Sequence, residues 1–111
     1  MLLHVATGPE WSAAPADPYR PASLASEGFV HCSPDEETAL AVAGAHYRDV
    51  PAPLLLVSLD EALLTTEVRW ERADGGLFPH VYGPVDRAAV TDVREIRRDA
   101  AGRVTGLAPW A

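Results

Sequence analysis

The segment Leu54–Leu59 (LLLVSL) constrains the fold of this chain more than any other stretch. It has the length of a strand, is apolar at nearly every position, and is bounded by Pro53 and Asp60. A strand with one solvated face alternates apolar and polar residues, whereas a continuous apolar run is typical of a strand covered on both faces. We therefore expect a central strand here, with the remaining elements packed around it.

Six other segments predict further strands: 2–6, 29–32, 67–71, 78–84, 90–97 and 103–107. Alternation along the third of these places Arg69 and Glu71 on one side, and alternation along the fourth places His80 and Tyr82 on one face. A turn at 74–76 (Asp-Gly-Gly) separates those two strands. Because the two main helices come early and most strands follow them, the pattern indicates an α+β fold with a split, mostly antiparallel sheet.

Two capping boxes predict where the helices begin. Thr7 and Ser33 each stand three residues before a glutamate, with a proline in between. These signals predict helices over 8–14 and 34–48, whereas the proline-rich and aperiodic stretch 16–27 predicts a surface loop. The second helix has an apolar stripe that predicts its buried face: Leu40, Ala43 and Tyr47.

Composition limits the function classes. The formal net charge of −7 argues against a broad nucleic-acid surface, although six of the nine basic residues, all arginines, lie between 69 and 98 and leave a local anion site open. A single cysteine excludes an internal disulfide. No apolar run reaches the ~18 residues of a membrane span, and no secretory leader pattern is present. We expect one domain over residues 1–111, cytoplasmic and not membrane-bound, with its oligomeric state left open.

Three of the four histidines fall on predicted strands: His4, His31 and His80. The stretch 28–36 places His31 where a strand passes into a helix, and the free amides of a first helical turn attract anionic or polar groups. His31 is therefore a candidate ligand-binding residue. The alternative is a half-buried histidine that holds a loop carbonyl.

Other chemistry at these positions is less favoured. A zinc site built from His31, Cys32 and His80 is disfavoured because neighbours on a strand point to opposite faces, so we expect no metal. The same geometry argues against a Cys32–His31 nucleophile pair. Glu71 is the most plausible carboxylate for general-base or cation-stabilising work, and its alternative is a solvated pairing with a neighbouring arginine.

Five motifs together resemble the small bacterial family catalogued as domain of unknown function 952, over roughly residues 2–97. They are HVAT at 4–7, PASL at 21–24, EGFVHCS at 27–33, RWE at 69–71 and FPHVYGP at 78–84. That family is similar in fold to the ADP-ribosyltransferases and RNA 2′-phosphotransferases. The resemblance therefore implies an ADP-ribosyltransferase-like split sheet around a cleft that holds NAD.

The resemblance also implies residue roles. Glu71 and His31 are the implied catalytic residues, with Glu71 stabilising the positive charge that develops on the ribose. The implied contacts to an NAD-type co-substrate are His4, Thr7, Ser33, His80 and Tyr82. Two departures argue against RNA phosphotransfer: the first motif lacks the glycine of the phosphotransferase pattern, and no clear arginine stands beside His31 to hold a 2′-phosphate.

The expected function is thus an ADP-ribosyltransferase-like enzyme, or a protein that binds NAD, ADP-ribose or another small nucleotide-like ligand. Two alternatives stay open. One is a non-catalytic small-ligand or interaction domain that keeps the cleft without transfer chemistry. The other is a metal-dependent hydrolase built on the histidines.

Overall fold

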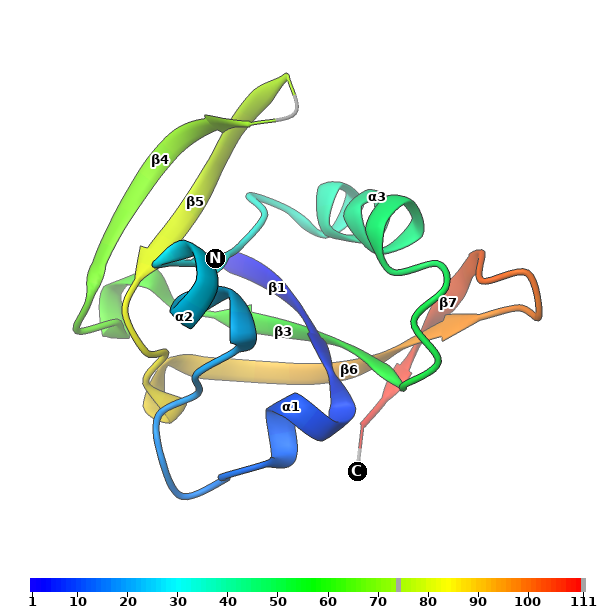
Figure 1. Ribbon diagram of the computed structural model, residues 1–111, viewed down its shortest axis with the longest axis horizontal. Coiled ribbons are helices and arrows are strands. Elements are labelled where there is room, and N and C mark those ends of the chain that lie inside the picture. Colours follow the sequence, from blue (N-terminus) through cyan, green and yellow to red (C-terminus); the bar gives the residue numbers. More distant parts are fainter. Residues whose placement is uncertain (74, 111) are drawn as a thin grey trace.

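The computed structural model describes residues 1–73 and 75–110. Within them the chain forms seven strands in two antiparallel sheets, together with three α-helices and two short 3-10 helices (Figure 1). The predicted mixed α+β domain with a split antiparallel sheet is therefore confirmed at this level. No helix in the described parts of the chain is long and apolar enough to cross a membrane.

The larger sheet has the strand order β1-β3-β6-β7. Its strands are β1 (Leu2–Thr7), β3 (Leu54–Leu59), β6 (Val90–Arg98) and β7 (Val104–Pro109). All six residues of β3 are buried, and apolar side chains from its two faces enter two separate clusters of the core. The prediction of a central strand covered on both faces is confirmed.

The smaller sheet has the order β2-β5-β4. Its strands are β2 (Val30–His31), β5 (Gly76–Tyr82) and β4 (Glu67–Ala73). Arg69 lies opposite His80 in the register, so the β4 residues of odd number share a face with His80 and Tyr82, as alternation predicts. The predicted turn at 74–76 includes Asp74, which lies outside the described residues.

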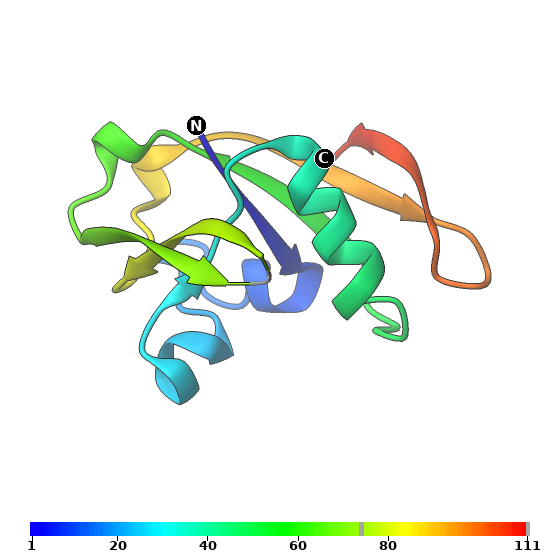
Figure 2. The same ribbon diagram turned by 90° about the horizontal axis from the view of Figure 1, so that it is seen from above.

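A short bridge joins the two sheets. Ser33 and Leu3 exchange both backbone hydrogen bonds, with N···O distances of 2.6 and 2.9 Å. This bridge explains why the predicted capping box at Ser33 is wrong: the bridge fixes the Ser33 backbone beside β1, and Asp35 caps α3 (Glu36–His46) through Thr38 N at 2.7 Å. In Figure 2, β1 lies between the β4–β5 hairpin on one side and α3 on the other.

The first helix is shorter than predicted, and a second one replaces the predicted loop. Thr7 caps α1 (Gly8–Ser12), but the Glu10 carboxylate accepts a hydrogen bond from Ala22 N at 2.7 Å instead of closing the predicted box. That contact lies at the start of α2 (Ala22–Glu27), which ends at Gly28 with φ of 87°. Six residues are too few for an apolar period, which is why sequence periodicity misses this helix.

The two 3-10 helices are η1 (Glu61–Leu63) and η2 (Arg87–Ala89). The first follows β3 directly and is capped by Asp60, whose carboxylate accepts the Ala62 amide hydrogen at 3.0 Å. Both lie at the end of the larger sheet where β3 passes toward the hairpin and where β6 begins.

Candidate functional site

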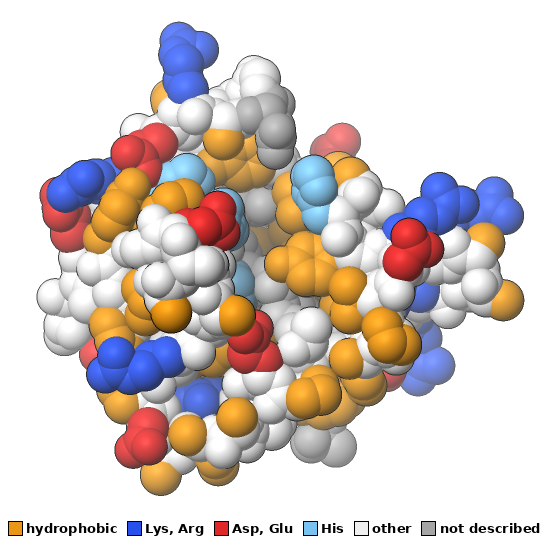
Figure 3. Space-filling view, viewed as in Figure 1, with side chains coloured by type: hydrophobic (Ala, Val, Ile, Leu, Met, Phe, Trp, Pro, Cys, Tyr) orange, Lys and Arg blue, Asp and Glu red, His pale blue; other side chains and the backbone are white. Residues whose placement is uncertain are grey.

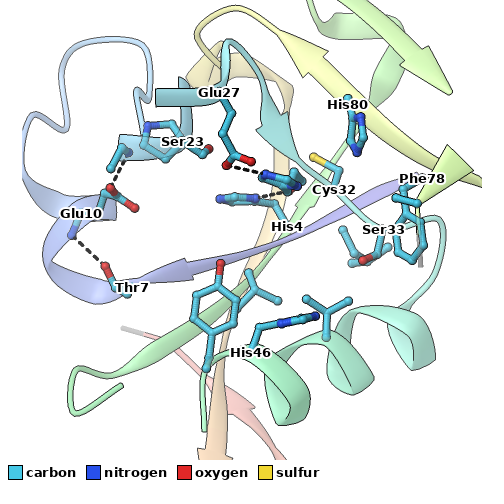
Figure 4. Close-up of a pocket in the computed structure, with 18 residues that line it drawn as sticks. His4, Thr7, Glu10, Ser23, Glu27, Cys32, Ser33, His46, Phe78 and His80 are labelled. Carbon is cyan, nitrogen blue, oxygen red and sulfur yellow. Dashed lines mark hydrogen bonds and ion pairs between the residues drawn. The ribbon is translucent and has the colours of Figure 1, made fainter. Parts of the chain in front are cut away.

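A cleft of about 480 Å³ runs along the free edge of β1, between the smaller sheet and α3. Its walls come from β1, α1, α2, β2, α3 and the β4–β5 hairpin (Figure 4). The volume lies within the ~300–1,000 Å³ that is usual for small-molecule sites. All four histidines of the chain line this one cleft: His4, His31, His46 and His80. The sequence places them 15 to 34 residues apart, so only the fold gathers them.

His80 is held from behind by a carboxylate. Its Nδ1 lies 2.8 Å from Glu71 Oε1, and Tyr82 donates its hydroxyl hydrogen to the same oxygen at 2.5 Å. The antiparallel register of β4 and β5 places all three side chains on one face. Phe29 stacks on the His80 ring, with the ring centroids 4.1 Å apart. The orientation of the imidazole is thus fixed by a hydrogen bond and by a stacked ring.

The charge distribution in this group follows from its hydrogen bonds. The bonds from Tyr82 and His80 hold the pKa of Glu71 below its usual value, and the same bond from Tyr82 raises the pKa of the phenol. An ionised Glu71 only accepts, so His80 Nδ1 carries the hydrogen that it donates. In the neutral ring the lone pair is then on Nε2, which has no hydrogen-bond partner within residues 1–73 and 75–110. A carboxylate-backed imidazole of this kind can accept or donate a proton.

His31 stands directly beside His80. The two residues are opposite each other in the β2–β5 register, and their rings meet edge-to-face with centroids 5.5 Å apart. His31 Nε2 lies 2.9 Å from Glu27 Oε2, and both side chains are half exposed. The predicted ligand-binding histidine therefore lies on the cleft wall, paired with a carboxylate from α2.

His4 is placed differently although it lines the same cleft. It is buried, and its Nδ1 donates to the His31 carbonyl at 2.6 Å while its Nε2 accepts from the Tyr19 hydroxyl at 2.8 Å. Burial lowers the pKa of His4 to about 4, so the ring is neutral at physiological pH. Burial also raises the pKa of Tyr19, which keeps the hydroxyl hydrogen available for donation. Both ring nitrogens of His4 are thus used to tie β1 to β2 and to the segment that carries Tyr19.

The other predicted site residues divide into two sets. Thr7 and Ser33 line the cleft. Glu71 and Tyr82 do not line it: they lie behind His80, and the Tyr82 ring is covered by the Arg69 guanidinium at 4.3 Å. The ligand-binding and catalytic roles of all these residues stay predictions.

Several lining residues were not singled out by the sequence. Glu27 reaches the cleft from α2, which was predicted as a loop, and Glu10 reaches it because its carboxylate turns toward α2. Phe78 could have been found, since it shares the alternating face of His80. Tyr47 lines the cleft as well as packing on the core, where its helical spacing predicted it.

Cys32 is an unsuitable nucleophile in this environment. It is buried, and burial raises the pKa of its thiol to about 12, so the reactive thiolate is not formed at neutral pH. Within the described residues no group of three or more His, Cys, Asp and Glu side chains could hold a metal ion. The expectation that no metal takes part stays a prediction.

Comparison with known proteins identifies the family. The model of a protein family of unknown function, DUF952, matches residues 5–93. The chain belongs to the DUF952 family. Its fold is similar to the crystal structure of protein CC0527 from Caulobacter crescentus, a structural genomics target, with 28% identity over 94% of this chain and 92% of that chain and a TM-score of 0.80. The solution NMR structure of CC0527 gives 28% identity over 91% and 88% of the two chains and a TM-score of 0.70.

The family match confirms the resemblance of the five sequence motifs to domain of unknown function 952. No curated protein matches the sequence. The family match and the similar solved structures therefore support the fold of this chain and indicate no activity.

Proposed function

We propose that this DUF952 protein binds a nucleotide of the NAD or ADP-ribose type in the cleft beside β1 and is an ADP-ribosyltransferase-like enzyme. One observation carries the proposal: His31 and His80 stand side by side on the cleft wall, with Glu71 hydrogen-bonded behind His80. The resemblance of residues 4–7 to the first-strand motif of the ADP-ribosyltransferase superfamily, and of residues 31–33 to the second histidine-bearing strand of the phosphotransferases, adds support from the sequence.

His80 is the proposed acid–base residue. In transfer, the bond between the ribose C1′ and nicotinamide breaks and its electron pair leaves with nicotinamide, while an acceptor O–H or N–H forms the new bond to C1′. His80 Nε2 accepts the proton that the acceptor loses, and Glu71 stabilises the imidazolium that results through Nδ1. Glu71 therefore acts through His80 as a positioning residue, and His31 is the second histidine at the reacting end.

The cleft fits the nucleoside part of such a ligand better than its phosphates. Phe78, Val42 and Tyr47 supply apolar surface for a planar ring, and the hydroxyls of Thr7 and Ser33 can hydrogen-bond a ribose. The described lining contains no arginine to hold a pyrophosphate. A nucleoside portion is accommodated, and the phosphates have no cationic partner inside.

Calorimetric titration with NAD and ADP-ribose tests the proposal, combined with an assay of nicotinamide release. We expect saturable binding that weakens at least about tenfold in His80→Ala and His31→Ala, because each removes a wall of the cleft. Glu71→Gln should retain binding and lose about 10²-fold or more of the turnover, since it removes the charge behind the base. Glu61→Gln, an exposed substitution on η1, is the matched control. An absence of saturable binding at millimolar ligand overturns the proposal.

A second candidate is a small-ligand-binding domain without transfer chemistry. It is favoured by one observation: Glu71 does not itself line the cleft, so no carboxylate behind the histidines contacts a ligand there directly. This candidate predicts that Glu71→Gln changes neither the affinity nor any turnover, and the same titration therefore separates the two.

A further inference from the structure

The charges around the cleft are strongly one-sided. Glu10 and Glu27 line it, and none of the nine arginines does, in a chain that has no lysine. Figure 3 shows acidic and histidine side chains around the hollow of this face, with most arginines toward the periphery. His4 contributes no positive charge, because its burial keeps it neutral. A ligand that enters this cleft meets carboxylates on the side of α1 and α2.

Two of the arginines make their contacts away from the cleft lining. Arg87 lies over the Trp11 ring at 4.4 Å and donates to the carbonyls of Asp17 and Ala14. Arg69 pairs with Glu67 at 2.9 Å on the hairpin. The cluster of arginines between residues 69 and 98, which left an anion site open in the sequence, therefore does not build one at this cleft.

Helix amides do not replace the missing cations. Among the described residues α3 is the only long helix that borders the cleft, and its first turn already carries the Asp35 cap together with Glu36 and Glu37. Asp35 accepts the Thr38 amide hydrogen that a phosphate would use. Phosphate recognition in proteins rests mainly on Arg and Lys side chains or on such free amides. The described lining has no Arg or Lys, and the Thr38 amide of α3 is already bonded to Asp35.

We propose that the cleft selects a nucleoside without its phosphate: an uncharged or cationic nitrogen heterocycle joined to a ribose. The inference rests on the proposed function and names the substrate class of the same site. The planar base packs against Phe78, and the carboxylates of Glu10 and Glu27 accept hydrogen bonds from ribose hydroxyls and favour a positive charge on the base. Any phosphate of a longer ligand lies outside the cleft.

Two probe pairs that differ by a single phosphate test this: nicotinamide riboside against nicotinamide mononucleotide, and adenosine against AMP. We expect each nucleoside to bind at least about tenfold more tightly than its monophosphate, because a dianion is brought close to two carboxylates. The cationic nicotinamide riboside should bind more tightly than adenosine. Raising the salt concentration should reduce the difference in affinity between each nucleoside and its monophosphate, called the nucleoside–monophosphate gap, because screening weakens the repulsion between phosphate and carboxylates.

Two variants connect that gap to the named carboxylates. Glu10→Gln and Glu27→Gln should each narrow the nucleoside–monophosphate gap about two- to threefold or more by removing one negative charge from the lining. Glu61→Gln removes the same charge from η1 and should leave the gap unchanged. An equal narrowing in Glu61→Gln would assign the effect to net charge alone and overturn the inference.

The outcomes separate the inference from the proposed function. Tighter binding of either monophosphate than of its nucleoside overturns the inference and leaves nucleotide binding in the cleft standing. If none of the four probes binds at millimolar concentration, and NAD and ADP-ribose also fail, both proposals are overturned. Binding of both nucleosides with the expected difference in affinity supports the inference, and saturable binding of NAD or ADP-ribose supports the proposed function.

Discussion

His4 and His80 both line one cleft and are almost equally buried, with exposed fractions of 5% and 6%. Their hydrogen bonds distinguish them. His4 uses both ring nitrogens on groups of the chain, Tyr19 and the His31 carbonyl, whereas His80 uses one on Glu71 and directs no bond from the other to any described residue. Burial and residue type are therefore a poor guide to function. The number of ring nitrogens left for a ligand distinguishes the two: His4 has none left, which gives it a structural role, whereas His80 has one left, which supports its proposed role in chemistry.

The largest predicted difference between the two histidines is the loss of protein stability when each is replaced by alanine. His4→Ala leaves the Tyr19 hydroxyl and the His31 carbonyl without a buried partner, and we expect it to lower the free energy of unfolding by about 3–5 kcal/mol. His80→Ala removes a stacked ring from the cleft wall and should cost less than half as much. Urea denaturation of both variants measures the difference.

If both variants lost the same free energy of unfolding, the structural role would not distinguish His4 from His80. A larger loss in His80→Ala would assign the structural role to His80 instead. Tyr19→Phe sharpens the result because it removes only the hydroxyl that His4 accepts from. It should cost about 1–2 kcal/mol, with the ring packing retained.

The second prediction concerns pH. The folded-state pKa of His4, about 4, is below the unfolded value of 6.5, so the unfolded chain binds more protons between these two values. The contribution to stability is therefore complete above pH 6.5 and is lost as the pH falls toward 4. We expect a loss of about 2–3 kcal/mol between pH 6.5 and pH 4.5, measured by denaturation at each pH.

Two controls isolate that effect. The carboxyl groups whose pKa is lowered in the fold, including Asp35, Glu67 and Asp99, lose their contribution to stability as the pH falls from their ordinary values of 3.8 to 4.5 toward their lower folded values, and so mostly below the pH 6.5–4.5 window. His4→Ala removes the buried imidazole and should flatten the profile between pH 6.5 and pH 4.5. A flat profile from pH 6.5 to 4.5 in the unaltered protein would contradict the assignment of His4 as a buried neutral ring.

The smallest expected effect tests the hydrogen bonds behind His80. The Tyr82 hydroxyl donates to Glu71, and this bond raises the pKa of the phenol. Glu71→Gln replaces the charged acceptor by a neutral one, so the pKa of Tyr82 should fall toward its ordinary value. Spectrophotometric titration of the tyrosines measures this, with Tyr82→Phe identifying the transition. An unchanged Tyr82 transition would show that Glu71 is not its partner in solution.

Parts of the site follow from local sequence and parts do not. Alternation along β5 was enough to place His80 and Tyr82 on one face, because the period of a strand is fixed by its backbone. The carboxylate partner needed the register of a second strand, which alternation does not supply. The helix α2 and the Asp35 cap were missed because two distant contacts decide them, Glu10 with Ala22 and Leu3 with Ser33.

What the sequence determined by itself is the class of the fold: the apolar segment 54–59 requires burial on both faces, and the flanking alternating segments require a sheet with one face solvated. The tertiary structure alone decided which histidine is structural. His4 and His80 lie in similar short strands, and their difference depends on whether Tyr19 or Glu71 is brought within hydrogen-bond distance. Hydrogen bonds act over about 3 Å, whereas these partners are 15 and 9 residues away along the chain, so no local pattern encodes them.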